Sequence, residues 1–347
     1  MTIAPVRSAP PPDAAPQRRR AAAALGAGLA ALLVLCVLSV AVGSRGVGLA
    51  DIVCALTAPG DDEVTAIVRG LRVPRTALGL LAGAALGLAG ALMQAITRNP
   101  LADPGIFGVS AGAAFGIAAS IALFGLTSLY GFIWFALLGA LAAGLLAQLI
   151  GSLGRTGATP VSLALAGVAV STLLGSMTSA VVLTDPAALN RYRFWSAGSL
   201  AGQDAGVLVQ VAPFVAAGTV LALALAPQLN SLALGDDVAR GLGRHPGRTR
   251  ALGIVAVTLL TGAAVAVAGP IVFLGLVIPH LARFFTGPDH RWLLPLSAVL
   301  APCLLLAADI LGRVVARPSE IQVGVLTAVI GGPFFVALVR RRRIAEL

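Results

Sequence analysis

Long stretches without a charged residue alternate with short arginine-containing segments along most of the chain. Each uncharged stretch has about 17 residues or more, within the range that an α-helix needs to cross the ~30 Å hydrocarbon core of a membrane. The stretches lack the alternating polarity of strands in a membrane barrel. The pattern therefore predicts an all-α membrane protein.

Ten helices fit into these stretches. Two stretches, Pro104–Gly154 and Ala251–Ala282, are too long for one helix, and we expect them to break at residues 125–131 and at 268–270. The other six helices are expected in Ala21–Ser44, Thr76–Thr97, Thr156–Thr184, Ala205–Gly235, Trp292–Ala308 and Ile321–Val339. An even number of spans places both termini on one side. Residues 1–20, with five prolines and a final run of three arginines, are expected to form a disordered cytoplasmic tail before a single transmembrane domain of residues 21–343.

Composition and charge support a membrane protein with a defined orientation. Hydrophobic residues make up 58% of the chain and charged residues 11%, and the mean hydropathy is +0.95, whereas soluble domains are about one quarter charged. All 24 basic residues are arginines. If the N-terminus is cytoplasmic, 16 of them fall in inner segments and 8 in outer ones, as the positive-inside rule requires. This distribution favours membrane loops over nucleic-acid binding. The outer arginines are Arg45, Arg69, Arg72, Arg75, Arg191, Arg193, Arg313 and Arg317.

The residues in the spans exclude several kinds of chemistry. A phosphate-binding P-loop needs a lysine, and the chain has none, so any ATP must be bound by another chain. Ion-coupled transporters place acidic residues within spans; here Asp309 is the nearest example, and we expect it at the outer end of the ninth helix, bonded to a neighbour. His280 could relay protons or bind a ligand, but a lone histidine at a helix end is more often simply hydrogen-bonded. Cys36, Cys54 and Cys303 lack CxxC spacing and are interpreted as packing residues, not as a disulfide or metal site.

Small residues recur on the second predicted helix. Gly79, Gly83, Gly87 and Gly90 are separated by four, four and three residues. Such a stripe lets helices approach closely in lipid. We interpret it as tight packing within one compact bundle.

A series of short motifs resembles the FecCD-type permease family of ABC importers for iron-siderophores, haem and cobalamin. The resemblance covers nearly all of residues 70–340, with the motifs in the same order. The segments that carry it are Leu71–Arg75, Gly90–Gln94, Asn99–Gly105, Gly108–Ser110, Leu165–Gly167, Phe194–Trp195, Ala233–Asp237, Val267–Pro270, Gly275–Arg283, Asp289–Arg291, Ala308–Asp309 and Gly331–Phe334.

The resemblance implies a fold, a set of partners and a function. The fold would be the ten-transmembrane-helix bundle of type II ABC importer permeases, in the bacterial cytoplasmic (inner) membrane. The chain would pair with a second permease copy or a close paralogue, with two cytoplasmic ATPases that bind ATP and Mg²⁺, and with an extracytoplasmic substrate-binding protein. It would be no enzyme and hold no cofactor. A ferric siderophore is the first expected cargo, with haem and cobalamin open. The alternative is an ATP-independent secondary transporter or channel, which needs no ATPase-docking helix.

The resemblance assigns binding-protein docking to Arg72, Arg75 and Arg313. In this family, arginines at these positions receive glutamates from the two lobes of the binding protein. Guanidinium groups suit that role because they form bidentate pairs with carboxylates. The alternative is that these arginines anchor the chain at the membrane edge by snorkelling.

The resemblance also assigns ATPase coupling to the segment of residues 230–250. Acidic residues before Leu242 and a glycine after it suit the start and end of a short helix. A plain solvated loop is the alternative. The residues assigned to coupling are Asp236, Asp237, Arg240, Leu242 and Gly243.

Two inner loops match the family's cytoplasmic gate. The matching residues are Asn99 and Leu101 in one loop and Thr159 and Pro160 in the other. Pro160 departs from the small polar residue that the family leads us to expect. Its alternative role is to form a turn.

Overall fold

The structure, a computed structural model, describes residues 14–43, 46–58, 60, 62–105, 108–126, 128–153, 160–184, 195–202 and 205–340. The described residues form helices and no strand, as the sequence predicts. The long helices are α1 (Ala14–Ala41), α4 (Val73–Thr97), α5 (Val109–Phe124), α6 (Leu129–Ser152), α7 (Pro160–Leu183), α9 (Ala205–Ala233), α11 (Pro246–Ala268), α12 (Leu274–Thr286), α13 (His290–Val315) and α14 (Val323–Arg340). The short ones are α2 (Leu49–Thr57), α3 (Glu63–Thr65), the π-helical η1 (Ala66–Arg72) and α10 (Asp236–Gly241).

Each of the ten predicted helices overlaps one of the long helices, although α1, α4, α11, α12, α13 and α14 extend beyond the predicted bounds. The two predicted breaks are confirmed, because α5 ends at Phe124 before α6 begins at Leu129, and α11 ends at Ala268 before α12 begins at Leu274. Among the described residues, seven helices are long and apolar enough to cross a membrane, while α5, α12 and α14 are shorter apolar helices. The count of ten spans therefore stays a prediction.

The first helix begins earlier than the sequence predicts. α1 starts at Ala14, so the expected tail of residues 1–20 overlaps its first two turns. Alanine, glutamine and arginine are good helix formers, and they extend the apolar helix past the membrane segment. Residues 1–13 lie outside the described residues.

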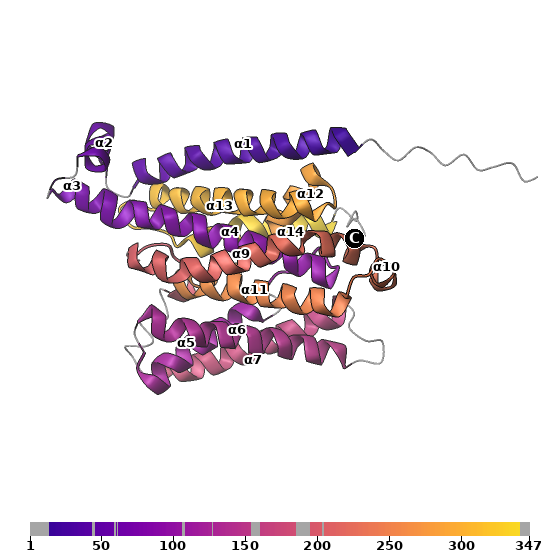
Figure 1. The fold of residues 1–347 in the computed structure, drawn as a ribbon. Helices are drawn as coiled ribbons and strands as arrows, with labels where there is room; N and C mark the ends of the chain where they lie inside the picture. Colours follow the sequence, from indigo (N-terminus) through magenta and orange to yellow (C-terminus); the bar gives the residue numbers. More distant parts are fainter. Residues whose placement is uncertain are drawn as a thin grey trace, which may run out of the picture.

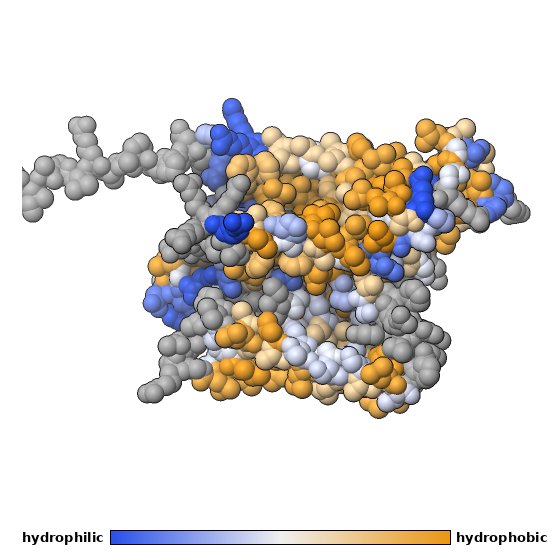
Figure 2. Space-filling view, turned by 180° about the vertical axis from the view of Figure 1, so that it is seen from behind, coloured by the Kyte–Doolittle hydropathy of each residue, from blue (hydrophilic) through white to orange (hydrophobic). Residues whose placement is uncertain are grey.

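The long helices lie side by side in a bundle (Figure 1). α1 packs on α13, and α4 packs against α13, α11, α12 and α9. At the other side of the bundle, α5, α6 and α7 pack on one another, and both α5 and α6 also contact α11. In the most apolar stretch of α4, 78% of the residues are buried, against 11% in α1, so α4 lies at the centre and α1 at the edge. Following the orientation that the sequence predicts, we call the end of the bundle where α1 begins the inner end and the end where α1 terminates the outer end. Hydrophobic residues cover much of the side seen in Figure 2, with the most hydrophilic ones towards the two ends.

Glycines of α4 allow the backbones of neighbouring helices to approach it. A Cβ on Gly83 would lie 2.6 Å from the Cα of Pro302 in α13, and a Cβ on Gly90 would overlap the carbonyl oxygen of Gly275 in α12. Backbone atoms cannot swing aside as a flexible side chain can. The glycine stripe is therefore a packing stripe, as predicted.

A buried glutamine completes the contact between α4 and α12. Pro279 lies inside α12 and has no N–H to donate to the carbonyl four residues earlier, that of Gly275. The Nε2 of Gln94 in α4 donates to the carbonyls of Gly275 and Leu276, at 3.2 and 3.3 Å. The Oε1 of Gln94 accepts from Arg283 at 2.6 Å. In lipid, such a freed carbonyl must find an internal donor, and Gln94 supplies it.

Substitution of Gly83 by alanine tests the close contact. Because the new methyl group would meet backbone atoms, we expect Gly83→Ala to lower the free energy of unfolding by about 1–3 kcal/mol. Thermal unfolding of the purified protein in detergent measures this. Gly70→Ala in η1 is the matched control, since a Cβ there would meet no atom within 4 Å. An equal effect of both substitutions would contradict the packing role of Gly83.

Candidate functional site

The inner end carries a short helix at the place that the sequence predicts. α10 spans Asp236–Gly241, and two backbone hydrogen bonds close its end: Gly243 N–H donates to Arg240 at 2.9 Å, and Arg244 N–H donates to Ala239 at 2.9 Å. Gly243 has φ +72°. These are the bonds and the left-handed glycine of a Schellman motif, so Gly243 terminates α10.

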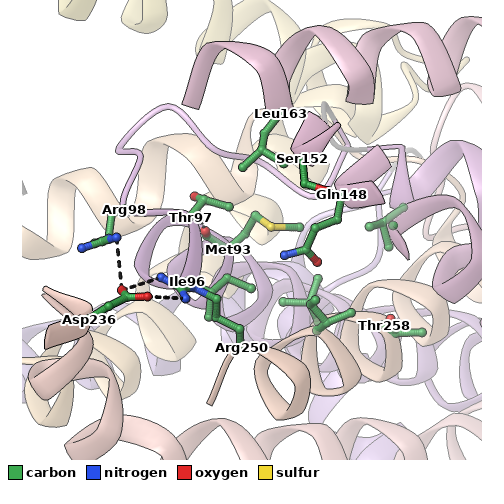
Figure 3. Close-up of a pocket in the computed structure, with 14 residues that line it drawn as sticks. Met93, Ile96, Thr97, Arg98, Gln148, Ser152, Leu163, Asp236, Arg250 and Thr258 are labelled. Carbon is green, nitrogen blue, oxygen red and sulfur yellow. Dashed lines mark hydrogen bonds and ion pairs between the residues drawn. The ribbon is translucent and has the colours of Figure 1, made fainter. Parts of the chain in front are cut away.

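Two arginines attach the start of α10 to the long helices (Figure 3). The carboxylate of Asp236 accepts two hydrogen bonds of 2.8 Å from Arg250 in α11 and pairs with Arg98, the residue after α4, at 3.2 Å. The hydrogen bonds from Arg250 lower the pKa of Asp236 below its ordinary value. We call these three residues the inner clamp, which joins α10 to the inner ends of α4 and α11.

The rest of α10 presents apolar side chains to the outside of the chain. Leu242, directly after the helix, is 59% exposed. Val238 inside the helix and Leu234 before it are also exposed, while Ala239 is buried. Asp237 pairs with Arg240 at 2.9 Å on the exposed surface. An exposed apolar cluster on a helix held by ion pairs suits contact with another protein.

A cavity of about 500 Å³ opens beside the inner clamp. Apolar residues such as Met93, Leu163 and Val257 line it together with Arg98, Asp236 and Arg250, and Figure 3 shows that side chains from several helices point into it. Two of its lining residues are close in sequence to the predicted gate residues, because Arg98 directly precedes Asn99 and Leu163 follows Pro160 by three residues.

The gate residues themselves have local roles where the structure describes them. The Oδ1 of Asn99 accepts a hydrogen bond from the Leu101 N–H at 2.9 Å, which forms a turn after α4. Pro160 is the first residue of α7, a position that proline favours because its missing N–H would have no helical partner. Thr159 lies outside the described residues.

The outer end brings together the three arginines assigned to docking. Arg72, Arg75 and Arg313 line one cavity of about 410 Å³ with Glu320. Arg75 donates to both oxygens of Asp309 and pairs with Glu320 at 2.6 Å, and Arg313 pairs with Asp309 at 2.9 Å. Asp309, 1% exposed, is bonded to neighbours, as the sequence predicts.

The last carbonyls of α1 hold two of these arginines in place. Arg72 donates to the carbonyls of Val40 and Ala41, each at 2.9 Å. Arg313 donates to those of Ser39 and Val42, each at 2.9 Å. A third arginine, Arg317, donates to the carbonyl of Gly43 at 2.8 Å. We call these three arginines the outer caps.

The outer caps give Arg72, Arg313 and Arg317 a structural role that the sequence analysis did not predict. The last carbonyls of a helix lack partners within it, and positive charge suits the negative end of its dipole. Arg72 and Arg313 are 5% and 2% exposed, so docking through them requires access along the outer cavity. The signal was present in the sequence as positive charge at the outer end, but the acceptors could not be read from it.

The remaining candidates show no catalytic arrangement. The ring of His280 lies edge-on to Phe334, with centroids 6.0 Å apart, and the described residues contain no group of three metal-ligating side chains. All three cysteines are free thiols. Cys54 is exposed, so interpreting it as a packing residue was wrong; it lies on the polar face of the short helix α2.

Comparison with known proteins identifies the architecture. Residues 31–341 match the FecCD transport family. The chain is 45% identical over 315 residues to the ferric enterobactin transport system permease protein of Escherichia coli (strain K12), covering 90% of this chain and 94% of that protein. It is 39% identical to the hemin transport system permease protein of Yersinia pestis, covering 82% and 86% of the two chains. A solved metal-chelate-type ABC transporter in an inward-facing conformation superposes with a TM-score of 0.77 at 30% identity, covering 91% and 98% of the two chains.

The inner clamp gives a prediction for the dynamics of α10. Asp236→Asn removes the charge that Arg98 and Arg250 share, and we expect faster amide hydrogen exchange throughout α10. Asp237→Asn is the control, because that side chain pairs only within the exposed helix. Equal exchange in both variants would show that the clamp does not hold α10.

Acid should release the same clamp only at low pH. The pKa of Asp236 in the folded state lies below the ordinary value of about 3.9. At a pH above about 3.9 the ionised carboxylate therefore stabilises the folded state, and this stabilisation is lost as the pH falls through the folded-state pKa. We therefore expect unchanged protection of α10 from about pH 7 to about pH 5, after correction for intrinsic exchange. Loss of protection already at about pH 5 would contradict this.

Proposed function

The chain belongs to the FecCD transport family, and from this membership we propose that it carries a ferric siderophore across the bacterial cytoplasmic membrane. It is an integral membrane permease subunit of an ABC importer, and not an enzyme. Its relatives are ABC permeases, which excludes the ATP-independent alternative. The observation that carries the siderophore proposal is 45% identity, over nearly the whole of both chains, to a permease for ferric enterobactin.

The proposed transport complex contains several other chains. A second permease, identical or paralogous, completes the pathway. Two cytoplasmic ATPases bind ATP and Mg²⁺, and an extracytoplasmic protein delivers the chelate. In this arrangement both termini are cytoplasmic and ten helices cross the membrane. Residues 1–20 lie on the cytoplasmic side, the last seven of them as the start of α1, and residues 21–343 form the permease domain. The arginine distribution along the chain supports this orientation.

We propose that α10 receives the ATPase. The exposed side chains of Leu234, Val238 and Leu242 would enter a cleft of that partner, with Arg240 and Asp237 at its rim. The inner clamp supports this role, because a displacement of α10 would act on α4 and α11 through Asp236.

Docking of the binding protein is proposed at the outer cavity. Arg72, Arg75 and Arg313 line it together, and carboxylates of the partner would approach them there. Complementary charge of this kind sets the orientation of a complex.

The cytoplasmic gate is proposed at the inner cavity, with Asn99 and Leu101 on one loop and Thr159 and Pro160 on the other.

An uptake experiment tests both the cargo and the coupling. Cells that depend on this permease and its partners should accumulate a radioiron-labelled ferric siderophore, and excess haem or cobalamin should not compete. Leu242→Arg should abolish uptake, because burial of an unpaired charge at an interface costs about 3 kcal/mol, roughly a hundredfold in ATPase affinity.

The control is Leu153→Arg, since Leu153 is an exposed leucine at the end of α6, outside α10. It should leave copurification of the ATPase unchanged. If excess haem or cobalamin lowers uptake of the labelled ferric siderophore, the competing compound becomes the proposed cargo in place of the siderophore. Normal ATPase binding by Leu242→Arg would overturn the role of α10.

A further inference from the structure

The short helix α2 has three different faces. Ile52 and Ala55 are buried against Val68 of η1. Leu49, Val53 and Leu56, at spacings of four and three residues, form a stripe along a neighbouring face and are 74%, 59% and 42% exposed. At 3.6 residues per turn, Asp51 and Cys54 lie on the remaining side, and both are exposed. α2 is therefore amphipathic, with part of its apolar side left uncovered by the chain.

Contacts at the C-terminal end and on the buried face of α2 fix the direction of the exposed stripe. Arg69 donates to the carbonyls of Ala55 and Leu56, at 2.8 and 2.7 Å, and so caps the end of the helix. Val40 and Ala41 at the end of α1 pack against the buried face. The stripe Leu49, Val53 and Leu56 is thus held outward by the fold.

The position of α2 relates this stripe to the membrane. Figure 1 shows α2 beside the outer end of α1, lying across the direction of the long helices. α1 crosses the membrane with an apolar surface that the chain leaves open, including Leu33 and Val37 at 67% and 61% exposure. Figure 2 shows hydrophobic and hydrophilic residues together on the projection that carries α2. α2 therefore lies at the end of a candidate membrane span whose apolar side chains the chain leaves largely exposed.

We propose that α2 is an interfacial helix that lies in the outer leaflet of the membrane. Leu49, Val53 and Leu56 contact acyl chains, and Asp51 and Cys54 face water. Nine residues are too few to span a bilayer, whereas a helix with one apolar and one polar side is suited to the plane of the interface. Lipid is favoured over a protein partner because α2 packs on the end of α1, a helix long and apolar enough to cross a membrane whose own apolar side chains are largely exposed. The proposal does not depend on the cargo.

Spin labels on adjacent faces of α2 test the proposal. The full chain is reconstituted in phosphatidylethanolamine and phosphatidylglycerol vesicles without other proteins, with Cys36 and Cys303 replaced by alanine. One variant carries the label on native Cys54, and the other combines Cys54→Ser with Val53→Cys. We expect the Val53 position to be several-fold more accessible to oxygen, which concentrates in lipid, and several-fold less accessible to a water-soluble nickel complex than the Cys54 position.

Leu49→Cys in the Cys54→Ser background repeats the measurement if the Val53 variant fails to elute as a monodisperse species. Equal nickel accessibility at the stripe and at Cys54 would overturn the proposal. The proposal would also be overturned if the labelled stripe position is accessible to the nickel complex in vesicles and becomes protected when the binding protein is added. The stripe would then be a protein-docking surface.

Discussion

Each backbone carbonyl that a helix leaves free at membrane depth must accept a hydrogen bond from elsewhere in the protein, and this constraint explains the main polar contacts of the bundle. At the end of α1, the carbonyls of residues 39–43 are bound by Arg72, Arg313 and Arg317. Within α12, Gln94 donates to the carbonyl that Pro279 leaves free. The outer caps also join α1, an edge helix with few buried residues, to η1 and α13.

The remaining charges follow from these arginines. Burial of Arg313 needs compensation, and Asp309 supplies it while pairing with Arg75 as well. At the inner end, Asp236 joins Arg98 and Arg250 in the same way. Small residues pack the middle of the bundle, and ion pairs connect helices at its ends, next to the two cavities. During the proposed transport, the ion pairs at the two ends of the bundle would therefore exchange partners, while the tightly packed α4 keeps its contacts with the neighbouring helices.

Much of this organisation could be predicted from the sequence because its cause is local. Uncharged runs predict the helices, Gly-containing segments predict the breaks at 125–131 and 268–270, and the acidic start and Gly243 predict α10. The acceptors of Arg72 and Arg313 could not be predicted, since they depend on which helix ends meet in space. α2 was missed because nine residues with one acidic side chain lack the length of a span. The start of α1 was missed because proline and arginine in residues 1–20 suggested a tail, although Ala14–Arg20 has good helix formers.

The most direct measurement is the thermal unfolding of Arg72→Gln and Arg313→Gln in detergent, with no binding protein present. If these arginines cap α1, each substitution removes donors from buried carbonyls and lowers the free energy of unfolding by about 1–3 kcal/mol. Arg291→Gln, an exposed position at the inner end of α13, should leave it unchanged. Unfolding identical to wild type in all three variants, with loss only of affinity for the binding protein, would contradict the account and assign these arginines to docking alone.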